Sequence, residues 1–106
     1  MENSLKPQRL RRQDAIDAAE AVAVEALGFL AGDSERLSRF VELSGIDPSG
    51  LRGAARQPGF LAGVLDHIAS DDSLLVTFAA NAGKSPEEVA RACALLAGRD
   101  GYEPSI

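Results

Sequence analysis

Residue types that build common catalytic and metal sites are scarce in this sequence. Its 106 residues include one cysteine, one histidine and no tryptophan. The single Cys93 excludes an internal disulfide and any zinc site that needs several cysteines. The single His67 excludes a second imidazole ligand for a metal and a proton relay between imidazoles. We therefore expect no metal site and no cofactor.

Long apolar runs are also missing. No stretch approaches the roughly 20 apolar residues that a membrane-spanning helix needs. The first residues carry charges where a secretory signal would need an apolar segment. We therefore expect a cytoplasmic protein that does not associate with membranes.

The sequence motifs of nucleotide-binding and hydrolytic enzymes are absent as well. The chain has no Walker loop, no GxGxxG, no GxSxG and no EF-hand loop. Its paired acids, Asp71 with Asp72 and Glu87 with Glu88, fall where first turns of helices are expected, and the helix dipole favours acids there. These patterns predict a protein that is not an enzyme and has no small-molecule substrate.

Helical periodicity is what the sequence does contain. With 45% hydrophobic and 25% charged residues, the composition is typical of one globular domain. Alternating β-branched runs and Asn-Gly turns, which would indicate strands, do not occur. Apolar residues at spacings of three and four, bounded by acids, glycines and prolines, predict an all-α fold of six helices. We expect these helices at about residues 11–31, 33–44, 48–55, 58–68, 71–83 and 85–98.

A segment of 29 residues occurs twice. Residues 27–55 align with residues 65–93 at a shift of 38 positions, with 8 identities. Most identical residues are helix caps, helix-ending glycines, helix-starting prolines and apolar residues, for example Asp33 with Asp71. The pattern predicts a compact six-helix domain built from two pseudo-repeats of three helices each, whose first helices meet near the centre.

Charge is distributed unevenly along the chain. The net charge is −5, of which residues 1–12 contribute +3 and the remainder −8. An acidic body repels phosphate backbones and anionic membranes, which argues against nucleic acid as a partner. The expected organisation is a flexible basic tail at 1–10, a single helical domain at 11–98 with repeat units at about 11–56 and 57–98, and a flexible C-terminal tail at 99–106.

The repeat also predicts the surroundings of the two chemically distinctive side chains. It aligns His67 with Phe29, which favours a partly buried imidazole on a core-facing helix over a pH-sensing role. It aligns Cys93 with Ala55, which favours a small buried thiol that behaves as a hydrophobic residue.

The segment from Leu37 to Arg56 has the order helix, glycine turn and short helix, as in a helix-turn-helix DNA-binding unit. In that arrangement Ser49, Arg52 and Arg56 would face the DNA groove. Glycines inside the short helix weaken it. The second repeat unit has the same order of helix, glycine turn and helix, but acidic residues occupy the equivalent turn, where a phosphate backbone would attract basic ones. Packing alone therefore explains the shared order.

Short motifs recur along most of the chain: Leu30-Ala31-Gly32-Asp33, Leu37-Ser38-Arg39-Phe40, Gly45-Ile46-Asp47-Pro48, Leu51-Arg52, Pro58, Phe60-Leu61, Val64-Leu65-Asp66, Leu74-Leu75, Pro86-Glu87 and Val89-Ala90. Together these motifs resemble a family of short, all-helical alphaproteobacterial proteins described only as a domain of unknown function. The resemblance covers about residues 15 to 98 and implies a bacterial cytoplasmic origin and a helical fold, without known catalytic residues. Lys84 stands where an apolar residue parallel to Ile46 is expected.

The sequence favours a non-enzymatic helical protein-interaction module that binds another protein or a second copy of itself. The expected partner-binding residues are Ser49, Leu51, Arg52 and Arg56. The short third helix is the least self-stabilised element, and its arginines place positive charge on an acidic protein. The competing hypothesis is a helix-turn-helix-like nucleic-acid-binding protein. A third hypothesis, a small-molecule site, predicts a polar pocket between the two repeat units.

Overall fold

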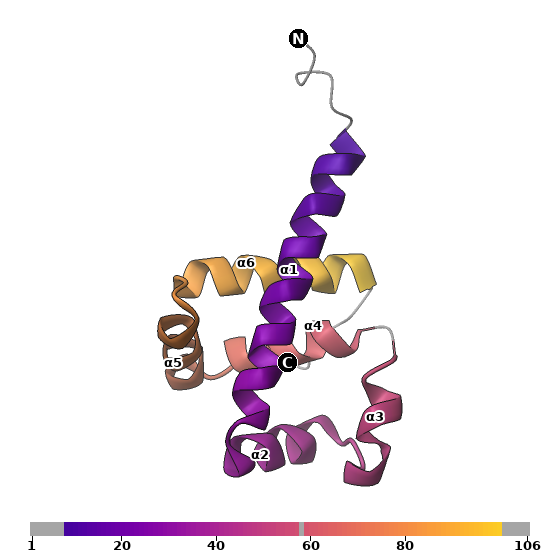
Figure 1. The fold of residues 1–106 in the computed structure, drawn as a ribbon, viewed down its shortest axis with the longest axis vertical. Helices are drawn as coiled ribbons and strands as arrows, with labels where there is room; N and C mark the ends of the chain where they lie inside the picture. Colours follow the sequence, from indigo (N-terminus) through magenta and orange to yellow (C-terminus); the bar gives the residue numbers. More distant parts are fainter. Residues whose placement is uncertain (1–7, 58, 101–106) are drawn as a thin grey trace.

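The computed structural model describes residues 8–57 and 59–100, and within them every regular element is helical (Figure 1). This confirms the predicted all-α class with six α-helices. The elements are α1 (Gln8–Ala31), α2 (Ser34–Ser44), the 3-10 turn η2 (Pro48–Gly50), α3 (Leu51–Ala54), α4 (Phe60–Ala69), α5 (Asp72–Ala82) and α6 (Pro86–Asp100).

The predicted caps of α2 and α5 are confirmed. The carboxylate of Asp33 accepts hydrogen bonds from the backbone N–H groups of Glu35 and Arg36, at 2.9 and 3.2 Å. These bonds satisfy amide groups that have no partner inside the helix. Asp71 accepts one equivalent bond from the N–H of Leu74 at 3.1 Å. Both helices end at a glycine with a positive φ angle, as glycine readily allows.

The predicted capping box at the start of α6 is also confirmed. The backbone N–H of Ser85 donates to the carboxylate of Glu88 at 3.0 Å, and the N–H of Glu88 donates to the Ser85 hydroxyl at 3.1 Å. The bond from the Ser85 backbone lowers the pKa of Glu88, because it stabilises the ionised carboxylate. The first turn of α6 is therefore stabilised by hydrogen bonds between residues that are only three positions apart.

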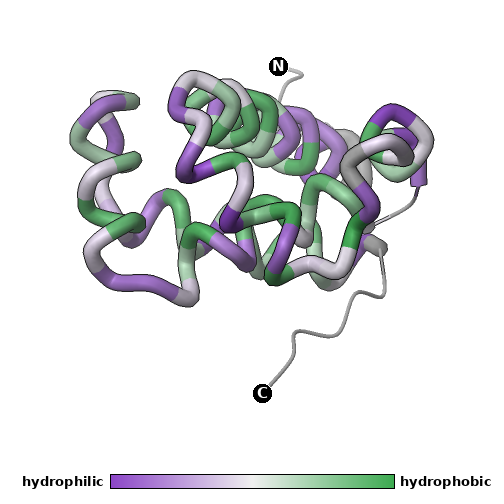
Figure 2. Tube along the Cα trace, turned by 90° about the horizontal axis from the view of Figure 1, so that it is seen from below, coloured by the Kyte–Doolittle hydropathy of each residue, from purple (hydrophilic) through white to green (hydrophobic). Residues whose placement is uncertain are grey.

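The core lies between α1, α4 and α6, which pack against one another most extensively. In Figure 1, α4 and α6 cross behind α1, while α2 and α5 lie toward its C-terminal half. Figure 2 shows hydrophobic and hydrophilic residues alternating along the helices, as expected for elements with one buried face. Small side chains let the helices approach closely. The fully buried large residues are Phe40, Phe78, Leu30, Leu65, Ile68, Leu96, Val64 and Val89.

The helices α1 and α4 meet as the repeat predicts. Leu30, Leu65 and Ile68 are fully buried where they pack, and Leu27 is partly buried against the same core. Apolar side chains therefore fill this part of the boundary between the two repeat units, where the third hypothesis placed a polar pocket.

The two pseudo-repeats remain a prediction. Equivalent helix ends recur in both units, but the third helices differ. The helix α3 has 4 residues and packs mainly on η2, whereas α6 has 15 residues and packs on α1 and α4. A four-residue helix has too little surface to contribute to the core in the way that α6 does.

The helix boundaries differ from prediction at both ends of the chain. The helix α1 begins at Gln8, so residues 8–10 are helical where a tail was expected. The helix α6 continues past Gly98 to Asp100, and the Arg99 side chain contacts Glu20 of α1. A basic residue in the last helical turn also complements the helix dipole. The expected tails at 1–7 and 101–106, and the role of Pro58, lie outside the described residues.

Candidate functional site

The segment that the sequence singled out for partner binding follows the glycine end of α2. The side chain of Asp47 accepts a hydrogen bond from the N–H of Ser49 at 3.1 Å, and its carbonyl accepts one from the N–H of Gly50 at 2.8 Å. These bonds form a tight turn that leads directly into α3. We call residues 49–56 the contact segment.

The four predicted partner-binding residues lie together on this segment. Ser49, Arg52 and Arg56 are exposed, and Leu51 is half-buried. The helix α3 contains no buried residue, and Leu51 does not belong to the apolar side chains packed against the core. Neither arginine forms an ion pair or a side-chain hydrogen bond with another described residue. The contact segment therefore adds little to the core and presents basic groups to solvent.

The helix-turn-helix interpretation places the same residues in a short element. The order of helix, glycine turn and short helix is present, with Gly45 at the end of α2 and α3 beginning at Leu51. The helix α3 has 4 residues, about one turn, whereas a recognition helix lies in the major groove and contacts bases along its N-terminal part. Arg56 follows α3 rather than lying within it.

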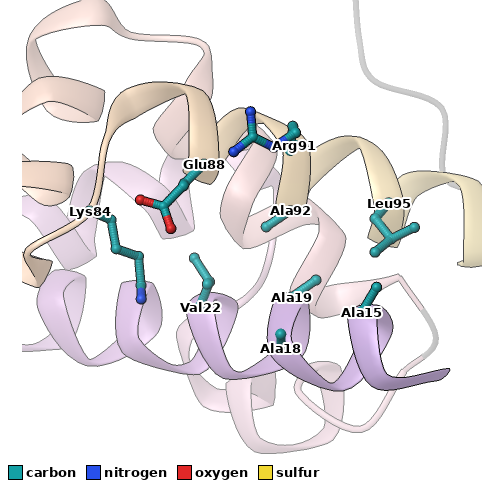
Figure 3. A pocket seen from close by; sticks show the side chains of 9 residues that line it. All are labelled: Ala15, Ala18, Ala19, Val22, Lys84, Glu88, Arg91, Ala92 and Leu95. Atoms are coloured by element: carbon teal, nitrogen blue, oxygen red, sulfur yellow. The ribbon is translucent and has the colours of Figure 1, made fainter. Parts of the chain in front are cut away.

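A second surface feature was not predicted from the sequence: an open groove of about 380 Å³ between α1 and α6 (Figure 3). Its walls carry small and apolar side chains, which leave space because most of them end at the β-carbon. These are Ala15, Ala18, Ala19, Val22, Ala92 and Leu95. We call this feature the α1–α6 groove.

Charged side chains form one edge of the α1–α6 groove. The Lys84 ammonium lies 3.9 Å from the carboxylate of Glu25, and Figure 3 shows its side chain extending toward α1. Glu88, which holds the capping box, and Arg91 complete this edge. Lys84 is the one residue of this edge that the sequence had singled out, because a charged residue stands there in place of the expected apolar one.

His67 is partly buried, as the repeat predicts. Its ring packs edge-on against Phe40, which in turn contacts Phe60 in a similar geometry at 6.1 Å between centroids. Burial lowers the pKa of His67, and the positive charge of Arg39 lowers it further. The imidazole is thus a packing group beside α2, and burial disfavours its charged form.

Cys93 packs against the core, as expected, but it is half-buried where a buried thiol was predicted. It lies at the edge of the inner face of α6, next to the buried Ala92. Burial raises the pKa of this thiol to about 11. A thiol with so high a pKa is mostly protonated at neutral pH and is a poor nucleophile.

The described residues hold no group of three or more histidine, cysteine or acidic side chains that could bind a metal ion. None of the helices in residues 8–57 and 59–100 is long and apolar enough to cross a membrane.

The fold and its surfaces define a small all-helical domain with a short basic contact segment and an alanine-lined groove. Residues 16–99 match the family described as Protein of unknown function (DUF3572). Because the match covers most of the chain, the protein belongs to this family, and the resemblance to a family of unknown function is confirmed. No curated protein and no solved structure matches the chain significantly.

Proposed function

We propose that this protein is a non-enzymatic, cytoplasmic protein-interaction module whose contact segment binds an acidic surface of another protein. The observation that supports the proposal is the placement of Leu51. It is the one large apolar residue of α3, it is half-exposed, and it lies outside the core cluster. An apolar side chain beside unpaired basic groups is the composition expected of a small binding surface.

Charge determines the kind of partner. The chain from residue 13 onward has a net charge of −8, so most of its surface repels acidic proteins. Arg52 and Arg56 are exposed exceptions close together in the sequence. An acidic partner surface would therefore be attracted locally to the contact segment and oriented by repulsion elsewhere.

Arginine also favours a protein partner with a specific geometry. Its planar guanidinium can bind a carboxylate through two parallel hydrogen bonds. The partner surface that fits best has one or two carboxylates flanking an apolar depression for Leu51. Ser49 adds an exposed hydroxyl to the same segment.

The experiment compares capture of partner proteins by the full chain and by two charge-reversal variants. In the first, Arg52 and Arg56 are both replaced by Glu; in the control, the exposed Arg91 of α6 is replaced by Glu. A captured protein is then purified, and its affinity for each variant is measured directly by calorimetry.

We expect the Arg52→Glu/Arg56→Glu variant to lose binding and Arg91→Glu to retain it. Leu51→Ala should weaken binding by roughly tenfold or more, the effect of removing a buried apolar anchor. Equal binding by all variants would overturn the contact segment as the binding surface.

Nucleic-acid binding is the competing function, because the same exposed arginines would also attract phosphates. It predicts a duplex-binding affinity that falls steeply as salt rises and is lost in Arg52→Glu. A gel-shift series with duplex DNA, starting at low salt, separates the two functions. Binding to DNA with this salt dependence, together with no protein partner, would replace the proposal.

A further inference from the structure

The α1–α6 groove is an apolar surface that stays open to solvent. Ala15 and Ala18 are exposed on its α1 wall, and Leu95 is half-exposed on its α6 wall (Figure 3). Below them lie the buried side chains of Ala19 and Ala92. An apolar groove between two helices is the kind of surface that binds the apolar face of a third helix.

The secondary structure of the two walls favours a helical partner over an extended one. Both walls are α-helices, so their backbone groups are hydrogen-bonded within each helix and offer no free strand edge. An extended partner would leave its own backbone N–H and C=O groups without partners in the groove. A helix satisfies its own backbone, and the alanines of the groove allow the helix axes to approach to about 8 Å.

Three charged side chains line the groove, and two of them already have a partner. The Lys84 ammonium lies 3.9 Å from the carboxylate of Glu25, and the Glu88 carboxylate accepts the bond from the Ser85 backbone. Arg91 contributes to the lowered pKa of Glu88, but it is exposed and forms no ion pair within 4 Å in the described part of the chain. The charge that the groove offers to a partner is therefore the Arg91 guanidinium.

We infer that the α1–α6 groove binds an amphipathic helix of another protein, whose apolar face covers the alanines and whose carboxylate pairs with Arg91. A guanidinium binds a carboxylate through two parallel hydrogen bonds, which would fix the position of the bound helix along the groove. The carboxylate belongs at the border of the apolar face that meets α6. The other border meets α1, which has four acidic and no basic residues over 13–31, so neutral or basic side chains fit there.

A second copy of this chain fits the groove less well than another protein does. Among the described residues, the large apolar side chains that are exposed are Val24, Leu43 and Val76. Val24 lies on α1, and a second α1 in the groove would bring the acidic residues of two α1 helices together. Leu43 and Val76 are the single exposed large apolar residues of α2 and α5, whereas a helix that binds in a groove needs several along one face.

The inference does not depend on the proposed function, because it uses a different surface. Its test selects binders of the full chain from a phage-displayed library of helix-forming peptides, randomised on one face and at both borders of that face. Selected peptides are synthesised, and calorimetry measures their affinity for the wild-type chain and its variants. Ala18 is exposed on the groove wall, so Ala18→Arg obstructs the groove without removing a core side chain. The matched control is Ala94→Arg, at an exposed alanine of α6 that does not line the groove.

We expect the selected peptides to carry an aspartate or glutamate at one border of an apolar face. Ala18→Arg should weaken their binding by about tenfold or more, because a charged side chain would have to be buried in the contact. Arg91→Gln should weaken it by about tenfold for the acidic peptide and much less for the same peptide with its acid changed to the amide. The Arg52→Glu/Arg56→Glu variant of the contact segment should bind these peptides as the wild type does.

A measurement on the wild-type chain covers the case in which Ala18→Arg does not fold. Titration with the peptide should shift the amide NMR signals of Ala15, Arg91 and Leu95, and leave those of the contact segment in place. The inference would be overturned by a selection that returns no binder, by peptides without the acid, or by binding that Ala18→Arg leaves unchanged. Sedimentation velocity that shows a dimer of the wild type, lost in Ala18→Arg, would also overturn it, because a second copy would then occupy the groove.

Discussion

The imidazole of His67 stands edge-on to the ring of Phe40, with the centroids 5.2 Å apart and the planes at 70°. This contact joins α4 to α2, two helices that are separated in the chain by the turn and the contact segment. It also shields part of the imidazole from water, and this burial disfavours the charged form and lowers the pKa of His67.

The first prediction concerns pH. Burial and the charge of Arg39 lower the pKa of His67 below its ordinary value of 6.5, although Asp71 and Asp66 oppose this. The unfolded chain therefore binds a proton at His67 more readily than the folded protein does. The free energy of unfolding should fall as pH drops from above 6.5 through the lowered pKa of the folded state.

Replacing His67 by Phe, the residue at the equivalent repeat position, should reduce this pH dependence while keeping an aromatic contact. Urea unfolding at pH 7.5 and pH 5.5 provides the comparison. Other groups also titrate in this range, so the difference between wild type and His67→Phe is the informative quantity. If the free energies of unfolding of wild type and His67→Phe changed equally with pH, His67 would bind protons equally well in the folded and unfolded states.

The second prediction concerns the core between α1, α4 and α6. Leu65 is fully buried, whereas Leu43 of α2 is 68% exposed. Leu65→Ala should lower the free energy of unfolding by about 2–5 kcal/mol, through lost burial and the cavity that remains. Leu43→Ala, the same chemical change, should alter it by about 0.5 kcal/mol or less. Denaturant unfolding measures both changes, and similar losses would mean that Leu65 is not buried more deeply than Leu43.

The third prediction uses two glycines with opposite roles. Gly45 ends α2 with φ at +75°, a conformation in which a side chain is strained, so Gly45→Ala should destabilise the protein by about 1–2 kcal/mol. Gly53 lies inside α3, and an added β-carbon would meet nothing within 4 Å. Gly53→Ala should stabilise by about 0.5–1 kcal/mol through better helix propensity. Thermal unfolding of both variants tests whether the two changes in stability have opposite signs.

The fourth prediction concerns the reactivity of Cys93. Burial raises its pKa to about 11 from an ordinary value of 9.0, so the thiolate is rare at pH 8. Reaction with a disulfide reagent such as DTNB should be roughly a hundredfold slower in the folded protein than in denaturant. A folded-state rate close to the denatured rate would indicate an exposed thiol.

Several features of the fold could be predicted because their physical causes are local. Asp33 binds amides two and three residues away, and Ser85 with Glu88 forms a reciprocal pair over three residues. Such contacts depend on residue type and spacing alone. The periodic apolar positions likewise identified the buried faces that contain Leu30 and Ile68.

Other features could not be predicted, because their causes lie between distant residues. The α1–α6 groove exists because alanines of α1 and α6 face each other, and nothing in either helix alone indicates which alanines are covered. Lys84 stands where the sequence pattern predicts an apolar residue, and its ammonium lies 3.9 Å from the carboxylate of Glu25 on another helix. The last turn of α6 extends through Arg99, whose partner Glu20 is 79 residues earlier.

The sequence by itself determined an all-helical chain and the positions of its caps and turns. It did so because hydrogen bonds within three or four residues and the periodicity of burial are written directly in residue order. Only the tertiary structure decided that α3 stays short beside a long α6, and that a groove opens between α1 and α6. These outcomes depend on which helices pack against the apolar core. Contacts between residues that are distant in the sequence decide this.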